Sequence, residues 1–106
     1  MNYGIVDIGS NTIRLNVYQI CQQDYSILFS KKYTAGLASY IKEGELSLDG
    51  INILKTTLKN ILEIKKSVKM EKLLFFATAS LRNVGNNQEV IAEIKEKLQV
   101  TIHLLS

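Results

Sequence analysis

The sequence predicts an α/β domain: a mixed five-stranded sheet, made of an antiparallel three-strand meander plus parallel strands, with helices packed on it. Three observations support this class. Apolar and polar residues alternate with period two through much of the first 33 residues. A helical period then extends over residues 48–68. After it, a strand-like, a helix-like and a second strand-like segment follow in order, which is typical of parallel strands joined by crossovers.

The meander is predicted from three alternating runs. Residues 3–8 and 12–21 form two strands around the turn Gly9-Ser10-Asn11, and residues 25–33 form a third strand after a polar turn. Residues 34–46 show no clear period and are predicted to form a loop.

The second half of the chain is predicted to hold the helices. Ser47 has the chemistry of an N-cap for a helix over residues 48–68, whose apolar stripe faces the core. The apolar run 72–77 predicts a strand buried on both faces. A second helix over 88–98 and a last strand over 100–105 complete the pattern.

Length and composition bound the function. The 106 residues make one domain at most, with 46% hydrophobic and 22% charged residues, an ordinary globular balance. The net charge of +3 suits a small anionic ligand and is too weak and too evenly spread to indicate nucleic acid. No apolar run approaches the ~20 residues of a membrane span, and the start has no signal-peptide pattern, so we expect a cytoplasmic protein without membrane association.

Cysteine and histidine are too scarce for most hydrolase schemes. One cysteine excludes an intrachain disulfide and a cysteine-rich zinc site. Cys21 ends an apolar strand, so we expect a buried or half-buried thiol rather than a nucleophile. His103, the one histidine, is expected to be a strand residue.

The stretch from Asp7 to Arg14 is the main candidate site. Gly9 can adopt a positive φ without penalty and leaves room for close backbone approach. The turn can direct backbone N–H groups and the side chains of Ser10 and Asn11 at an anion. Asp7 could hold water on a divalent metal, and the guanidinium of Arg14 suits phosphate oxygens. The alternative is a hairpin with solvated turn residues.

A second polar bend follows the strand 72–77. If the first and fourth strands are parallel neighbours, their carboxyl ends meet at one end of the sheet and the two bends lie side by side. This predicts a polyanion site formed by Asp7, Ser10, Asn11, Arg14, Thr78, Ser80 and Arg82. For Arg82 alone, the alternative is a surface residue on a short helix.

Three segments, taken in order, resemble the exopolyphosphatase and guanosine pentaphosphate phosphohydrolase (Ppx/GppA) family. They are Ile5–Arg14 (IVDIGSNTIR), Gly44–Ile51 (GELSLDGI) and Phe76–Asn83 (FATASLRN). The resemblance covers the whole chain. It implies that residues 1–106 are one RNase-H-like domain of the actin, Hsp70 and sugar-kinase superfamily, the N-terminal part of a longer two-domain enzyme.

The resemblance also implies an activity. Such enzymes hydrolyse the terminal phosphoanhydride bond of polyphosphate, or the 5′-phosphate of guanosine pentaphosphate, with magnesium. Carried over by position, Asp7 belongs to the metal and water side. The implied substrate-binding residues are Gly9, Ser10, Asn11, Arg14, Thr78 and Arg82. Polyphosphate and guanosine penta- or tetraphosphate are therefore the expected ligands.

Two departures from the family pattern concern the ligand. The members compared read Ala-Thr-Ser-Ala-Leu-Arg, whereas this chain has Ala77-Thr78-Ala79-Ser80-Leu81-Arg82, so the serine is displaced by one position. The segment Lys32–Ala38 lacks an arginine that many relatives carry there. The choice between polyphosphate and guanosine pentaphosphate therefore stays open.

The expected catalytic carboxylate belongs to a Gly-Glu-Glu-Glu segment that the family carries after the position of Ser106. We therefore expect no catalytic residue in this chain and no activity from these residues alone. Two alternatives stay open: half of another superfamily kinase, or a non-catalytic phosphate-binding or self-associating module. Apolar surface where a second domain would dock makes a homodimer plausible.

Overall fold

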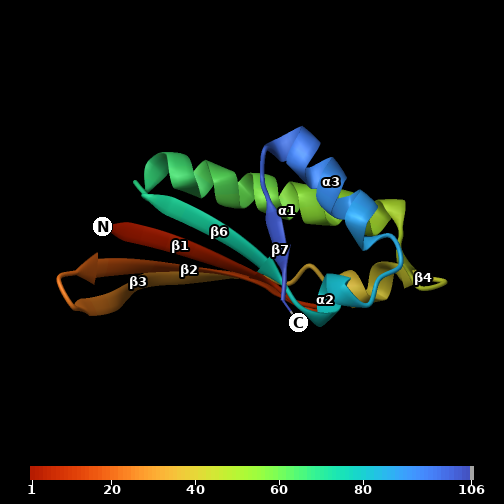
Figure 1. Cartoon of the computed structure of the whole chain (residues 1–106), viewed down its shortest axis with the longest axis horizontal. Helices are drawn as coiled ribbons and strands as arrows, with labels where there is room; N and C mark the ends of the chain where they lie inside the picture. Colours follow the sequence, from red (N-terminus) through yellow and green to blue (C-terminus); the bar gives the residue numbers. More distant parts are fainter. Residues whose placement is uncertain (106) are drawn as a thin grey trace.

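A five-stranded mixed sheet forms the centre of the fold in a computed structural model that describes residues 1–105 (Figure 1). Its strands are β1 (Asn2–Ile8), β2 (Ile13–Cys21), β3 (Asp24–Tyr33), β6 (Lys72–Ala77) and β7 (Ile102–Leu104). The spatial order is β3-β2-β1-β6-β7. The meander pairs are antiparallel, and β6 is parallel to both β1 and β7. The predicted mixed sheet is therefore confirmed.

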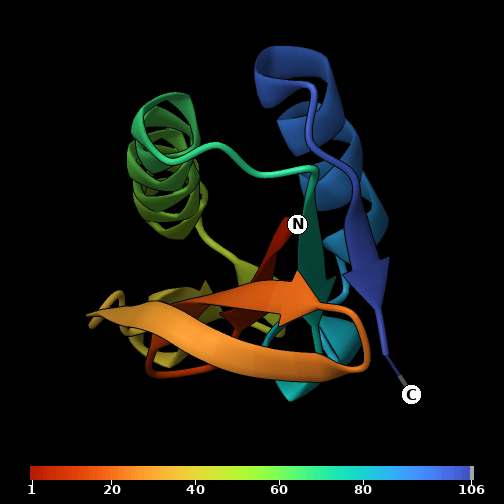
Figure 2. The ribbon, with the colours of Figure 1, turned by 90° about the vertical axis from the view of Figure 1, so that its left-hand side faces the viewer.

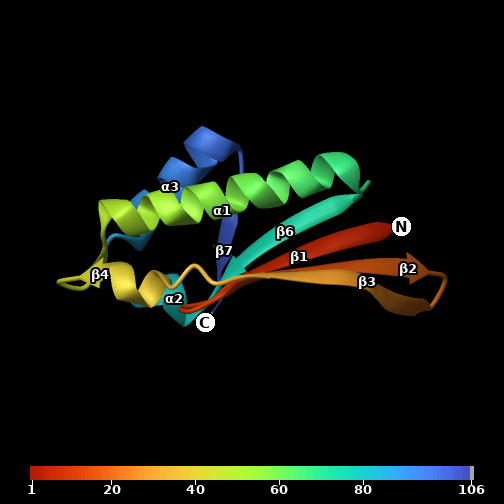
Figure 3. The same ribbon diagram turned by 180° about the vertical axis from the view of Figure 1, so that it is seen from behind.

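Helices and short elements connect the strands. They are η1 (Leu37–Tyr40), β4 (Ile41–Lys42), β5 (Glu45–Leu46), α1 (Leu48–Ser67), α2 (Ala79–Arg82) and α3 (Asn87–Leu98). The helix predicted over 48–68 is confirmed, and the side chain of Ser47 accepts from the N–H of Gly50 at 3.3 Å as its N-cap. The segment predicted as a plain loop holds η1 and the small β4–β5 hairpin (Figure 3).

The core lies between α1, α3 and one face of the sheet (Figure 2). Val6, Ile8, Leu15 and other alternate residues of the strands are fully buried there, as the period-two pattern predicts. The opposite sheet face carries no helix in the part of the chain that the structure describes (Figure 2). The prediction that residues 72–77 are buried on both faces is wrong, because Leu74 projects from the uncovered face and is 38% exposed.

The far end of the β2–β3 hairpin extends away from the helices (Figure 1). Cys21 ends β2 there and is exposed, so the predicted buried or half-buried thiol is wrong. The alternation that predicts burial continues along β2 beyond the part that a helix covers. His103 lies in β7 as predicted, with its ring centre 5.6 Å from that of Phe76.

Across residues 1–105, no helix has both the length and the apolar character that crossing a bilayer requires.

Candidate functional site

The two polar bends lie side by side at the end of the sheet where β1 and β6 finish. In the parallel β1–β6 pair, Ile8 is the partner of Ala77, so both strands end at the same level. The Ser80 hydroxyl, only 1% exposed, donates to the carbonyl oxygen of Ile8 at 2.5 Å. We call this region, residues 7–14 and 77–82, the carboxyl end. The predicted juxtaposition of the bends is confirmed, and a buried hydrogen bond joins them.

Gly9 allows the tight first turn because of space and not because of its φ angle. Its N–H donates to the carbonyl of Thr12 at 2.9 Å, and a Cβ added at Gly9 would lie 2.8 Å from that oxygen. The glycines with positive φ are Gly36 and Gly44. The prediction of close backbone approach is therefore confirmed, and the use of a positive φ at Gly9 is wrong.

The loop after β3 supports the first turn from one side. The carbonyls of Ser10 and Asn11 accept from the N–H groups of Ala38 and Gly36, both at 2.9 Å. Within residues 1–105, no protein acceptor takes the N–H of Ser10 or of Asn11. The turn is thus fixed through its carbonyls while these two backbone donors stay available, an arrangement that suits an anion.

Charged side chains meet on the uncovered sheet face beside this turn. Asp7 and Arg14 are Cα partners in the β1–β2 pair, and Arg14 is the partner of Lys32 in the β2–β3 pair. Like charges directly opposite each other destabilise a sheet. The ion pairs found within residues 1–105 are Lys55–Glu93 and Lys66–Glu63, so Arg14 and Lys32 add positive charge that an anion can neutralise. Sequence reasoning did not include Lys32 among the candidates.

The second bend is built on Thr78, which precedes α2. Its carbonyl accepts from the N–H groups of Leu81 and Arg82 at 3.2 and 2.8 Å, but its side chain makes no cap bond. Arg82 is exposed on this short helix, and its Nη1 donates to the carbonyl of Leu105 at 3.3 Å. Leu105 in turn donates to Ala77 at 2.8 Å. Arg82 therefore lies on the β7 side of the carboxyl end, and Arg14 on the β2 side.

One carboxylate, Asp7, comes to this region from β1. In the described part of the chain, no group of three or more His, Cys, Asp and Glu side chains gathers to hold a metal ion. Mg²⁺ typically takes one or two carboxylates together with substrate phosphates and water. A single carboxylate therefore fits a Mg²⁺ ion only where a bound anion and water supply most of its ligands.

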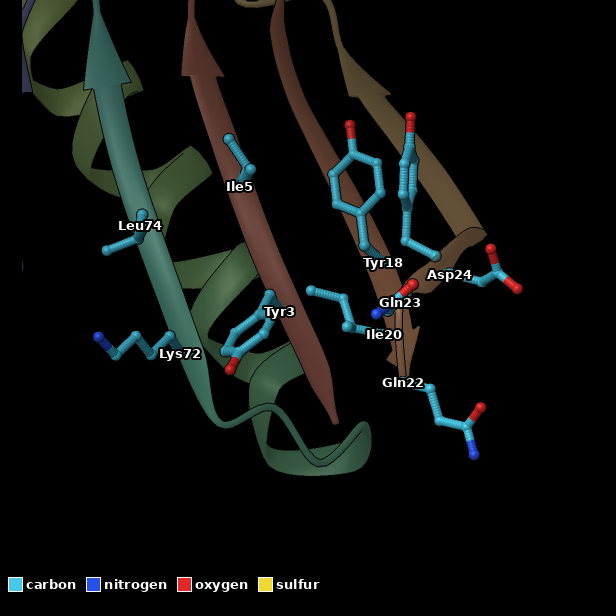
Figure 4. A pocket seen from close by; sticks show the side chains of 10 residues that line it. Tyr3, Ile5, Tyr18, Ile20, Gln22, Gln23, Asp24, Lys72 and Leu74 are labelled. Atoms are coloured by element: carbon cyan, nitrogen blue, oxygen red, sulfur yellow. The ribbon is translucent and has the colours of Figure 1, made fainter.

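A hollow of about 620 Å³ lies at the other end of the uncovered face (Figure 4). Its walls are mainly apolar, with Tyr3, Ile5, Tyr18, Ile20 and Leu74 among them. It offers no convergence of cationic or backbone donors comparable to the carboxyl end, so we do not assign the anion site to it.

Taken together, the sheet order β3-β2-β1-β6-β7 and the helices on one of its faces define an RNase-H-like domain in which β1 and β6 end in adjacent polar bends. The profile of the Ppx/GppA phosphatase family matches residues 16–106, and the chain belongs to this family. The family predicted from the sequence motifs is confirmed.

Individual relatives agree with this assignment. The chain is 27% identical over 107 residues to exopolyphosphatase 1 of Mycobacterium tuberculosis, covering 99% of this chain and 31% of that protein. A crystal structure of the Aquifex aeolicus Ppx/GppA family member superposes with a TM-score of 0.91 at 26% identity, over 99% of this chain and 35% of that one. The Thermus thermophilus RuvC structure, with a TM-score of 0.53 and 12% identity, shares the fold alone. The chain thus spans about a third of the length of these family relatives.

Proposed function

We propose that this chain forms one wall of the phosphate-binding cleft of an exopolyphosphatase or guanosine pentaphosphate phosphohydrolase. The reaction would cleave the terminal phosphoanhydride bond of polyphosphate or the 5′-phosphate of guanosine pentaphosphate. The observation that carries the proposal is the Ser80–Ile8 hydrogen bond, which fastens the two donor-bearing bends at the end of two parallel strands. Relatives named exopolyphosphatase favour polyphosphate as the first ligand to test.

The first turn would contact the phosphates through its backbone. In the turn Gly9–Asn11, the N–H of Gly9 is bonded to Thr12, and the unbonded N–H groups of Ser10 and Asn11 suit phosphate oxygens. Because the loop at Gly36 and Ala38 already fixes the turn's carbonyls, these donors need little reorganisation when an anion binds. Fixed donors of this kind stabilise developing negative charge during phosphoryl transfer to water.

Arg14 and Arg82 would bind the polyphosphate from opposite sides of the carboxyl end. Arg14 extends from β2 beside Lys32, and Arg82 extends from α2. A guanidinium binds phosphate oxygens through two parallel hydrogen bonds, which a lysine cannot do. Thr78 would support the second bend, since its carbonyl already holds the first turn of α2.

Magnesium is the proposed cofactor, with Asp7 as its protein ligand, directly or through water. Bound Mg²⁺ would neutralise charge on the phosphates and orient the terminal group. The carboxylate that activates water is proposed to belong to a part of the enzyme beyond these residues. We therefore expect the chain alone to bind polyphosphate weakly and to release no orthophosphate from it.

Calorimetric titration with polyphosphate and Mg²⁺ tests the site. Arg14→Ala should weaken binding about tenfold, because a bidentate charge-assisted contact is lost. Lys66→Ala, at a 73% exposed side chain on α1, is the matched control and should leave the affinity unchanged. Equal affinity of Arg14→Ala and the unaltered chain would refute the assignment. Parallel titrations with guanosine pentaphosphate and tetraphosphate would establish the ligand preference.

A non-catalytic, self-associating module is the second candidate, because the uncovered sheet face exposes several large apolar side chains. Steady release of orthophosphate from polyphosphate by the purified chain would contradict both this candidate and the expected inactivity.

A further inference from the structure

The outer strand β3 presents a long unpaired edge. Its ten residues, Asp24–Tyr33, pair with β2 on one side, and it is the last strand in the sheet order on the other. Most of its side chains are exposed, and the β2–β3 hairpin extends away from the helices (Figure 3). A long edge whose backbone N–H and C=O groups face solvent is a template for another strand.

The sequence of β3 is complementary to itself in the antiparallel orientation. Asp24 is at its start, Lys31 is near its end, and Ile27 and Leu28 in the middle are 56% and 44% exposed. When two such strands run in opposite directions, the acidic start of each meets the basic end of the other. The apolar centres then meet at the two-fold axis.

A β-bulge in β3 determines the register of this pairing. Val17 is opposite Phe29 but Tyr18 is opposite Ile27, so Leu28 is the extra residue. Asp24 and Lys31 are the partners of Cys21 and Leu15, two odd-numbered β2 residues, and so they share the face of the sheet on which the helices lie.

Tyr25 and Ser30 are the partners of Ile20 and Asn16 and share the uncovered face. A two-fold axis between Ile27 and Leu28 therefore pairs residues of the same face at each flanking position: 24 with 31, 25 with 30, and 26 with 29. Asp24 then faces Lys31 of the second copy, and Tyr25 faces its Ser30.

We propose that a second copy of this chain binds along β3, with the two β3 strands antiparallel in this register, so that one sheet continues through both copies. Lys32 lies on the opposite face from Lys31, beside Arg14, so the pairing leaves the charged cluster at the carboxyl end uncovered. Any other strand would need the same charge order to fit, and β3 itself supplies it. The proposal does not depend on the proposed phosphate site.

Sedimentation equilibrium of the 106-residue chain over a range of concentrations tests the proposal. We expect a reversible dimer. Asp24→Lys and Lys31→Asp should each raise the dissociation constant about tenfold or more, because each places like charges opposite each other twice. The double variant Asp24→Lys/Lys31→Asp should restore the original constant, since both charge pairs are re-formed with reversed sign.

The control exchanges charges elsewhere: Glu63→Lys/Lys66→Glu reverses an exposed pair on α1 and should leave the dimer unchanged. Hydrogen exchange provides a second measurement, because outward-facing amides of β3 should become protected as concentration rises. A chain that stays monomeric, a dimer indifferent to the single variants, or a double variant that fails to restore it would each overturn the proposal.

Discussion

The two turns that flank β2 differ in how the rest of the molecule holds them. The turn before it, at Gly9–Thr12, is bonded to the loop at Gly36 and Ala38 and lies beside the Ser80 contact to Ile8. The turn after it, at Gln22 and Gln23, is exposed, and Gln22 adopts a φ of 57°. One strand thus connects a turn that is hydrogen-bonded to a distant loop with a turn that, within residues 1–105, has no such bond; the nearest long-range bonds join Ile20 to Met1.

Packing explains the difference. Ile13, Leu15 and Val17 of β2 are completely buried, whereas Gln19 to Cys21 are exposed because the hairpin extends beyond the helices. Backbone donors are preorganised for a ligand only where packing fixes their direction. In this sheet that condition is met at the buried end of β2 and not at its exposed end.

Truncating the same side chain at each end should give the largest contrast. Ile8→Ala removes a fully buried side chain beneath the first turn and should lower the free energy of unfolding by about 2–5 kcal/mol. Ile20→Ala, at a residue 36% exposed near the hairpin tip, should cost less than about 1 kcal/mol. Urea denaturation of both variants measures this, and equal losses would break the comparison.

Ser80→Ala should have the next largest effect. It leaves the buried carbonyl of Ile8 without its donor, which should cost about 1–3 kcal/mol and weaken polyphosphate binding as the bends separate. Ser26→Ala, on the exposed outer strand, is the matched control and should change stability by less than about 0.5 kcal/mol. Denaturation and titration of the two variants together separate the structural from the binding effect.

Gly9→Ala should cost about 1–2 kcal/mol, because the added Cβ would lie 2.8 Å from the carbonyl oxygen of Thr12. In Gly85→Ala the nearest atom, the Gly44 oxygen, is 3.5 Å away, so that variant should be close to neutral. If thermal denaturation shows the same loss for both, the tight turn is not what constrains Gly9.

The smallest effect on the free energy of unfolding is expected at the exposed Gln22–Gln23 turn, and it has the opposite sign. Gln22→Gly relieves a left-handed backbone conformation and should stabilise the protein by about 0.5 kcal/mol after the entropic cost of glycine. A measurable loss of polyphosphate affinity in this variant would contradict the separation of the two ends.

Periodicity was enough to predict the five strands of the main sheet and the long helix. The order of the elements made a parallel β1–β6 pair the condition under which the two bends meet, and the structure has this pair. Periodicity could not predict the partner of Arg14. Counting back from the hairpin pair Cys21–Asp24 gives Lys31, but the bulge shifts the register by one residue to Lys32. A bulge follows from local twist and packing, which the alternation of residues does not record.

Burial was mispredicted for one reason in two places. Cys21 and Leu74 both lie in apolar runs, and both are exposed because neither the far end of the hairpin nor the uncovered face is packed against a helix. An apolar run records what a side chain prefers, but which surface covers it depends on the lengths and positions of distant elements. The secondary structure of residues 34–46 could not be predicted because strands of two residues, such as those that pair Ile41 with Leu46, are too short to show an alternating pattern.

The β1–β6 pair has a consequence for how the domain assembles. Through this strand pair the meander, residues 2–33, is joined to the helix-bearing segment, residues 48–104. The anion proposed for the carboxyl end would contact both of these segments, and its binding would therefore stabilise their association. Ligand concentration would then control the assembly of the two segments as well as occupancy of the site.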